Sequence, residues 1–139
     1  MENSKENNTL RLSLKTKWFE MTKAGVKTED YREITPYWAK RFLGQSQGFW
    51  KGYLGYNSNN RRCYGFKDQS SIDYITAKYG GLKSFDTNTM TLGYPKSTDT
   101  ERILTLEHKG IEIRMGNPEW GAEEGKLYFV ILHGRIINN

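Results

Sequence analysis

The stretch Gly25-Val26-Lys27-Thr28-Glu29-Asp30-Tyr31-Arg32 places a lysine, a hydroxyl, two carboxylates and a guanidinium directly after a glycine that can end a helix. Side chains in a strand alternate between two faces, so Thr28, Asp30 and Arg32 would share one face, opposite to Lys27. Such a set can bind a phosphate or the edge of a nucleobase. An ion pair between Asp30 and Arg32 on a solvated face explains the same residues, so both interpretations stay open.

The segments on either side of this stretch carry periodic apolar residues. Leu10, Leu12 and Leu14 alternate with polar residues, which is the period of a half-buried strand. From Thr16 the apolar spacing becomes helical, and Gly25 stands where a left-handed C-cap is needed. We therefore expect a strand at 10–14, a helix from Thr16 to Gly25, a strand at 28–34 and a short helix at 36–43, with Tyr37, Trp38 and Phe42 as its apolar side chains.

Residues 44–86 are rich in Gly, Ser, Asn and Tyr and show no sustained period, so we treat them as an insertion or variable segment. The run at 57–62 is typical of an exposed loop, and the apolar spacing at 70–79 predicts a helix. The aromatic residues of this segment suit base stacking, but a small satellite core is the better explanation. A lid, a dimer contact and a flexible loop all remain open roles for it.

The second half of the chain shows strand patterns. Residues 89–94 alternate apolar and small side chains up to Pro95. Residues 102–107 and 111–115 predict a hairpin joined by His108-Lys109-Gly110, with Ile111, Ile113 and Met115 on its inner face. Residues 127–132 are apolar on both faces, as in a central strand of a closed or covered sheet, and His133-Gly134 suggests a bulge or turn.

These elements add up to about six strands and two or three helices without a βαβ rhythm. They predict an α+β fold, a small mixed β-barrel with the helices packed on it. The chain has 139 residues, which fits one domain at 9–139 after a polar tail at 1–8 that cannot repay the entropy of ordering.

Composition limits the functional classes. The net charge of +5 and the pI of about 9.3 favour polyanionic partners. A single cysteine, Cys63, excludes an internal disulfide, and the distant His108 and His133 give no zinc spacing, so we expect no metal and no cofactor. No apolar stretch is long enough for a membrane span or a signal peptide, which predicts a cytoplasmic protein without a membrane partner.

In order along the chain, these features resemble the ASCH domains, a family related to the PUA-like barrels. The resemblance covers residues 9–137. It rests on a strand ending Leu-Ser-Leu-Lys, a helix with Trp18-Phe19, the motif Gly25-x-Lys27-Thr28-x-Asp30-x-Arg32, a Gly93-Tyr94 strand, and Trp120-Gly121 followed by Tyr128-Phe129-Val130-Ile131. It implies a β-barrel whose cleft, beside the first helix and the motif strand, binds single-stranded RNA, a nucleoside or a nucleotide.

On this resemblance the ligand-binding candidates divide into two groups. Lys27 and Arg32 would contact phosphate or a base edge, within a set completed by Thr28 and Asp30. A stacking wall would come from Tyr94 or Trp120. A tryptophan between Pro118 and Gly121 also suits a plug at the end of a barrel, and this is the stronger interpretation of Trp120.

Some ASCH proteins remove the acetyl group of 4-acetylcytidine with a lysine at the position of Lys27, a threonine at the position of Asp30 and a distant glutamate. An aspartate at position 30 pairs with Lys27 or Arg32 more readily than it acts as a nucleophile. If the protein is such an amidohydrolase, its catalytic candidates are Lys27, Asp30 and Glu119, with Asp30 or Glu119 as general base. A binding module is the leading hypothesis, and an interaction protein that docks a partner through 44–86 is the third.

Overall fold

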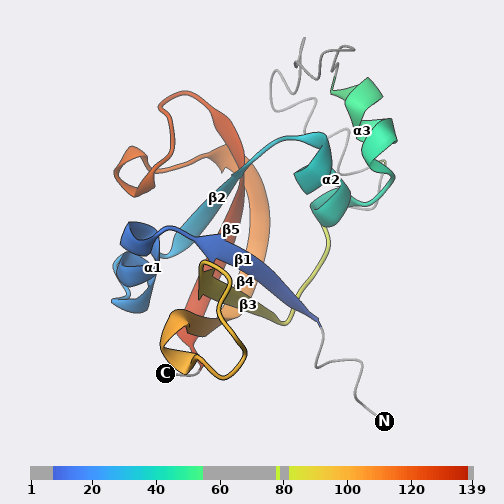
Figure 1. The fold of residues 1–139 in the computed structure, drawn as a ribbon. Coiled ribbons are helices and arrows are strands. Elements are labelled where there is room, and N and C mark those ends of the chain that lie inside the picture. The colour runs from blue at the N-terminus through green and yellow to red at the C-terminus, as the bar shows by residue number, and fades with distance from the viewer. Residues whose placement is uncertain (1–7, 55–77, 79–81, 138–139) are drawn as a thin grey trace.

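A computed structural model describes residues 8–54, 78 and 82–137 of the chain (Figure 1). Its elements are β1 (Thr9–Leu14), α1 (Thr16–Lys23), β2 (Glu29–Glu33), α2 (Pro36–Leu43), α3 (Gln47–Tyr53), β3 (Thr87–Leu92), η2 (Thr100–Arg102), β4 (Ile103–Met115), η3 (Pro118–Trp120) and β5 (Leu127–Ile136). None of the helices within these residues is long and apolar enough to cross a membrane.

The strands form one mixed sheet in the order β1-β3-β4-β5-β2. β1 and β3 are parallel, and the other neighbours are antiparallel. The sheet curls into a half-barrel, which agrees with the α+β class and the barrel-like shape predicted from the sequence (Figure 1). The described residues contain five strands rather than about six, because the predicted hairpin is a single strand.

The curl brings the two edge strands close together at one point. Arg32 on β2 donates a hydrogen bond from Nη2 to the backbone oxygen of Ser13 on β1, at 3.0 Å. The two residues lie on opposite edges of the sheet, so this bond spans the opening of the half-barrel. The motif strand is thereby fixed against the end of β1.

One hydrophobic core joins the inner face of the sheet to all three helices. It includes Phe19 from α1, Phe42 from α2 and Trp50 from α3, each at most 1% exposed. Trp50, with Phe49 and Tyr53 packed near it, belongs to this main core, so the satellite core expected for the aromatic residues is wrong for these three. The other aromatic residues of that prediction, Tyr56, Tyr64 and Phe66, lie outside the described residues. The helix α3 itself was not anticipated; Ser46 caps it by accepting a hydrogen bond from the Phe49 amide.

The passage from α1 to β2 follows the sequence prediction. Gly25 has a positive φ of 79° and lies directly after the C-cap residue Ala24. The amide of Gly25 donates to Thr22 O and that of Val26 to Met21 O, the paired hydrogen bonds of a Schellman motif. The turn therefore ends α1 at Lys23, with Ala24 as the C-cap, and places Lys27 two residues before the start of β2.

The hairpin predicted over 102–115 is wrong, because β4 runs unbroken for 13 residues. Gly110 has a φ of +126°, and the pairing with β5 shifts register on both sides of His108, so the glycine serves an irregularity within the strand instead of a turn. His108 lies within β4 and not in a loop. Ile111 and Ile113 are buried as predicted, whereas Met115 is 55% exposed and not on the inner face.

The remaining predictions have mixed outcomes. α2 has the predicted bounds, but Tyr37 is 49% exposed and is not one of its buried side chains. β5 has a neighbour on each side, as expected for an interior strand, and continues through His133 and Gly134. Its pairing with β4 shifts register on both sides of the His108–His133 pair, so the predicted bulge is present as an irregularity within the strand and there is no turn. The expected loop at 57–62 and most of the expected helix at 70–79 lie outside the described residues.

Candidate functional site

A cavity of about 350 Å³ opens where the two edges of the sheet approach each other. Its walls come from the end of β1, from α1, from β2 and from the loop around η3. Its lining includes Ser13, Trp18, Lys27, Asp30, Arg32 and Trp120. The motif strand therefore lines a concavity together with α1.

The register of β2 against β5 shows which motif side chains face inward. Asp30 is paired with Ile131 and Arg32 with Phe129, two residues of the main core. Asp30 and Arg32 thus share the inner face, as alternation predicted. Thr28 precedes the strand and is exposed, and it does not line the cavity; its backbone oxygen accepts a hydrogen bond from the His133 amide.

Lys27 does not follow the alternation that was predicted for it. Its side chain turns toward Asp30, and only 2% of the residue is exposed. Its Nζ donates to the backbone oxygen of Glu29 and lies 3.4 Å from Asp30 Oδ1. The rings of Trp18 and Tyr31 have their centroids 5.7 and 5.5 Å from Nζ. Burial lowers the pKa of Lys27, and the Asp30 carboxylate opposes this shift.

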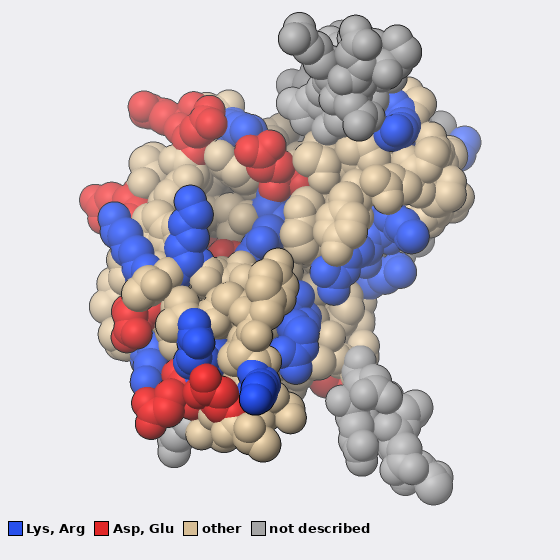
Figure 2. All heavy atoms as spheres, viewed as in Figure 1, with Lys and Arg blue, Asp and Glu red and all other residues tan. Residues whose placement is uncertain are grey.

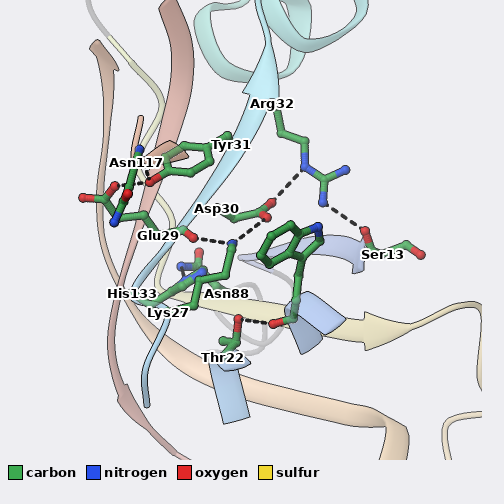
Figure 3. Close-up of polar contacts among 11 residues, drawn as sticks. Ser13, Thr22, Lys27, Glu29, Asp30, Tyr31, Arg32, Asn88, Asn117 and His133 are labelled. Atoms are coloured by element: carbon green, nitrogen blue, oxygen red, sulfur yellow. Dashed lines mark hydrogen bonds and ion pairs between the residues drawn. The ribbon is translucent and has the colours of Figure 1, made fainter. Parts of the chain in front are cut away.

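Asp30 is the centre of the polar contacts in the cavity. Figure 3 shows Lys27 and Arg32 both turned toward its carboxylate. Arg32 Nε donates to Asp30 Oδ2 at 2.9 Å, while its Nη2 bonds Ser13 O. Its Nη1 makes no hydrogen bond within the described part of the chain. The guanidinium is therefore held in place with donor capacity to spare.

The outer face of β2 fixes the loop that carries Trp120. The Tyr31 hydroxyl donates to Glu29 Oε1 at 2.7 Å and accepts from the Asn117 amide at 2.9 Å (Figure 3). Burial, with the hydrogen bond to Glu29, raises the pKa of Tyr31 to about 12. Burial alone would raise the pKa of Glu29, but the hydrogen bonds that it accepts from Arg114 and Tyr31 outweigh this effect, and the pKa is lowered. Ionised Glu29 and neutral Tyr31 thus tie the loop to the motif strand.

The structure brings only some of the other predicted residues to the cavity. Trp120 lines it and is half-buried, so the residue can serve as a wall as well as a plug. Tyr94 is 97% exposed beyond the end of β3 and does not line the cavity, so the structure does not place this predicted stacking residue at the site. Glu119 is exposed on η3 and does not line the cavity either.

Two features of the site were missed at the level of sequence. Trp18 lines the cavity from α1, and a Cβ placed on Gly121 would come within 2.9 Å of its indole, so a residue without a side chain lets the loop approach α1. The helical spacing of Trp18 indicated a buried face and gave no sign of a ligand wall. Its proximity in sequence to the Lys27 motif was the available signal.

The second missed feature is a buried polar chain across three strands. Asn88 on β3 is fully buried. Its Oδ1 lies 2.7 Å from Nδ1 of His108, and its Nδ2 lies 2.7 Å from Nδ1 of His133. The same Nδ2 donates to Leu132 O, so His133 Nδ1 is an acceptor. The Nε2 atoms of both histidines are buried without a hydrogen-bond partner in the described residues.

Comparison with protein-family models, with curated proteins and with solved structures found no match for this chain. Among the described residues no group of three or more His, Cys, Asp or Glu side chains could hold a metal ion. The geometry of the cavity and its charges are therefore the observations that bear on function.

Proposed function

We propose that the cavity binds a nucleotide, either free or as part of single-stranded RNA. The observation that carries this proposal is a fixed guanidinium beside two indole rings in one cavity. Asp30 and Ser13 O hold Arg32, so little order has to be gained when a phosphate or base edge binds it. Trp18 and Trp120 line the same space, and an indole face can stack on any base.

The two cations of the motif have different parts in this proposal. Nζ of Lys27 is engaged by Glu29 O and by the Asp30 carboxylate in the interior. Arg32 keeps free donors and is less deeply buried. Arg32 is therefore the primary contact for the ligand, and Lys27 holds the Asp30 carboxylate in position. A volume of about 350 Å³ lies at the small end of ligand pockets, which suits one nucleotide better than a larger ligand.

Replacing Arg32 by glutamine should weaken binding of short single-stranded RNA about tenfold, since one phosphate contact and its counterion release are lost. Fluorescence anisotropy at several salt concentrations measures this, and the slope of log K against log salt should fall by about 0.7. Arg135→Gln is the matched control, because Arg135 is exposed at the end of β5 and does not line the cavity. Equal effects of the two variants, or no binding by the wild-type chain at low salt, would rule the proposal out.

An amidohydrolase acting on an acylated nucleoside is the second candidate, and the buried Lys27 with its lowered pKa favours it. The rest of the geometry gives it less support. Both Asp30 oxygens already accept hydrogen bonds from Lys27 and Arg32, which makes Asp30 a poor general base, and Glu119 is outside the cavity.

For this reason we expect 4-acetylcytidine incubated with a high concentration of the protein to be recovered intact by mass spectrometry. Release of cytidine that disappears in Lys27→Ala would reverse the order of the two candidates. Release that persists in Lys27→Ala would point to a contaminating activity, so the variant also serves as the control.

A further inference from the structure

A continuous strip of cationic and aromatic side chains leads from the cavity onto α2. We call Arg32, Trp38, Arg41 and Tyr37 the α2 strip. Arg32 lines the cavity and has its Cζ 5.2 Å from the ring centroid of Trp38. Arg41 Cζ is also 5.2 Å from that ring and lies 6.0 Å from the ring of Tyr37. Each member therefore contacts the next, from the cavity wall to an exposed tyrosine.

The inner part of the strip is anchored and its outer part is accessible. Trp38 stacks on the buried Phe42, with 5.5 Å between ring centroids and an interplanar angle of 19°. Tyr37 packs edge-on against Trp38 at 4.8 Å, yet it is 49% exposed. Within the described residues Arg41 forms no ion pair with an acidic side chain. The strip thus offers a fixed aromatic base, an available ring and an unneutralised guanidinium.

The charges around the cavity favour a bound polyanion that extends toward α2. Figure 2 shows Lys and Arg side chains gathered below α2 and beside β1, whereas Asp and Glu side chains gather over the loop around η3. In that loop Glu119, Glu123 and Glu124 are exposed. A polyanion that occupies the cavity is repelled on the side of the η3 loop and attracted on the side of α2.

From these contacts we infer that the ligand is a single-stranded RNA longer than one nucleotide, whose neighbouring phosphate and base lie on Arg41 and Tyr37. This assignment rests on the proposed function, because the strip begins at the cavity-lining Arg32. Exposed aromatic rings alternating with arginines are the combination that proteins use for unpaired strands, since stacking accepts any base and arginine contacts both ring faces and phosphates.

The test compares two probes, short single-stranded RNA of mixed sequence and the common ribonucleoside 5′-monophosphates, by calorimetric titration at low salt. The RNA should bind more tightly than the monophosphates. Tyr37→Ala and Arg41→Gln should each weaken RNA binding about tenfold and leave monophosphate binding unchanged. Arg32→Gln should weaken both probes, and Arg135→Gln, which removes the same charge as Arg41→Gln, should affect neither by more than a small factor.

Three results would overturn the inference. If the monophosphates bind as tightly as RNA, or if neither strip variant weakens RNA binding beyond the Arg135→Gln control, the strip is not a nucleic-acid surface while the cavity proposal survives. If the wild-type chain binds neither probe, the cavity proposal fails as well. The remaining partner for the strip would then be an acidic protein surface. Circular dichroism of both variants distinguishes lost binding from lost folding, and Tyr37, being exposed, gives the variant least able to disturb the fold.

Discussion

Replacing Asp30 by alanine should lower the free energy of unfolding by about 3 kcal/mol at pH 7, because it leaves a buried ammonium without its partner. Lys27 and Asp30 are 2% and 5% exposed, so water cannot readily replace the lost carboxylate. Arg32 loses its anchor in the same variant. Urea unfolding followed by circular dichroism measures the change as a shift of the midpoint at constant slope.

The loss should shrink as the pH rises toward 10.5, the ordinary pKa of a lysine. Burial already lowers the pKa of Lys27 in the folded protein, and Asp30 opposes that shift. Without Asp30 the folded-state pKa falls further below the unfolded value. The unfolded chain then binds more protons than the folded one over this range, so stability increases with pH.

Two controls separate this effect from an ordinary lost contact. The double variant Lys27→Met, Asp30→Ala should be more stable than Asp30→Ala alone, because it leaves no unpaired charge. Glu33→Ala removes the exposed carboxylate that pairs with Lys126 at 3.1 Å, and should cost less than about 1 kcal/mol. An Asp30→Ala variant as stable as Glu33→Ala would show that Lys27 is not charged in the folded protein.

Acidification should destabilise the protein through His133. Burial lowers the pKa of His133 from 6.5 to about 4; Asp30 raises it, while Lys27 and His108 lower it further. Between these two pKa values the unfolded chain binds a proton at His133 that the folded chain does not bind. The free energy of unfolding is therefore unaffected by His133 above pH 6.5 and falls as the pH drops toward 4. The full shift corresponds to about 3 kcal/mol.

The hydrogen bonds of the buried polar chain also disfavour protonation of the His133 imidazole. His133 Nδ1 accepts from the Asn88 amide, whose nitrogen is oriented by Leu132 O, so a proton on Nδ1 would face another donor. His133→Asn keeps an acceptor near that position and removes the titration. Unfolding measured from pH 7.5 to 4 should therefore show about 3 kcal/mol less pH dependence in this variant. An imidazole that titrates near 6.5 by NMR, or equal pH dependence in both proteins, would contradict the assignment.

Much of the first half of the fold can be predicted from the sequence because each element there is specified locally. The alternation of Leu10, Leu12 and Leu14, the glycine at position 25 and the proline at the first position of α2, Pro36, each define one boundary. β1, α1, β2 and α2 are accordingly found within one or two residues of their predicted bounds. The inward face of Asp30 and Arg32 follows from the same local rule.

The sequence predictions are wrong or incomplete where the conformation of a residue depends on contacts with distant parts of the chain. A glycine with positive φ occurs in hairpin turns and in strand irregularities alike, so only the pairing of β4 with β5 shows that Gly110 belongs to an unbroken strand. Lys27 precedes β2, so strand alternation does not govern its side chain, and contact with Asp30 turns it inward. Asn88 and His133 meet through the curl of the sheet, and no local pattern connects them.

The hydrogen bonds that Lys27 and Arg32 make to the backbone also bear on the solubility of the protein. β1 and β2 are the two edges of the sheet, and unpaired peptide groups on edge strands can recruit a strand from another molecule and start aggregation. Lys27 Nζ donates to the carbonyl of Glu29 on β2, and Arg32 Nη2 donates to that of Ser13 on β1. At this corner the edge carbonyls are already engaged by cations, which discourages edge-to-edge association between chains.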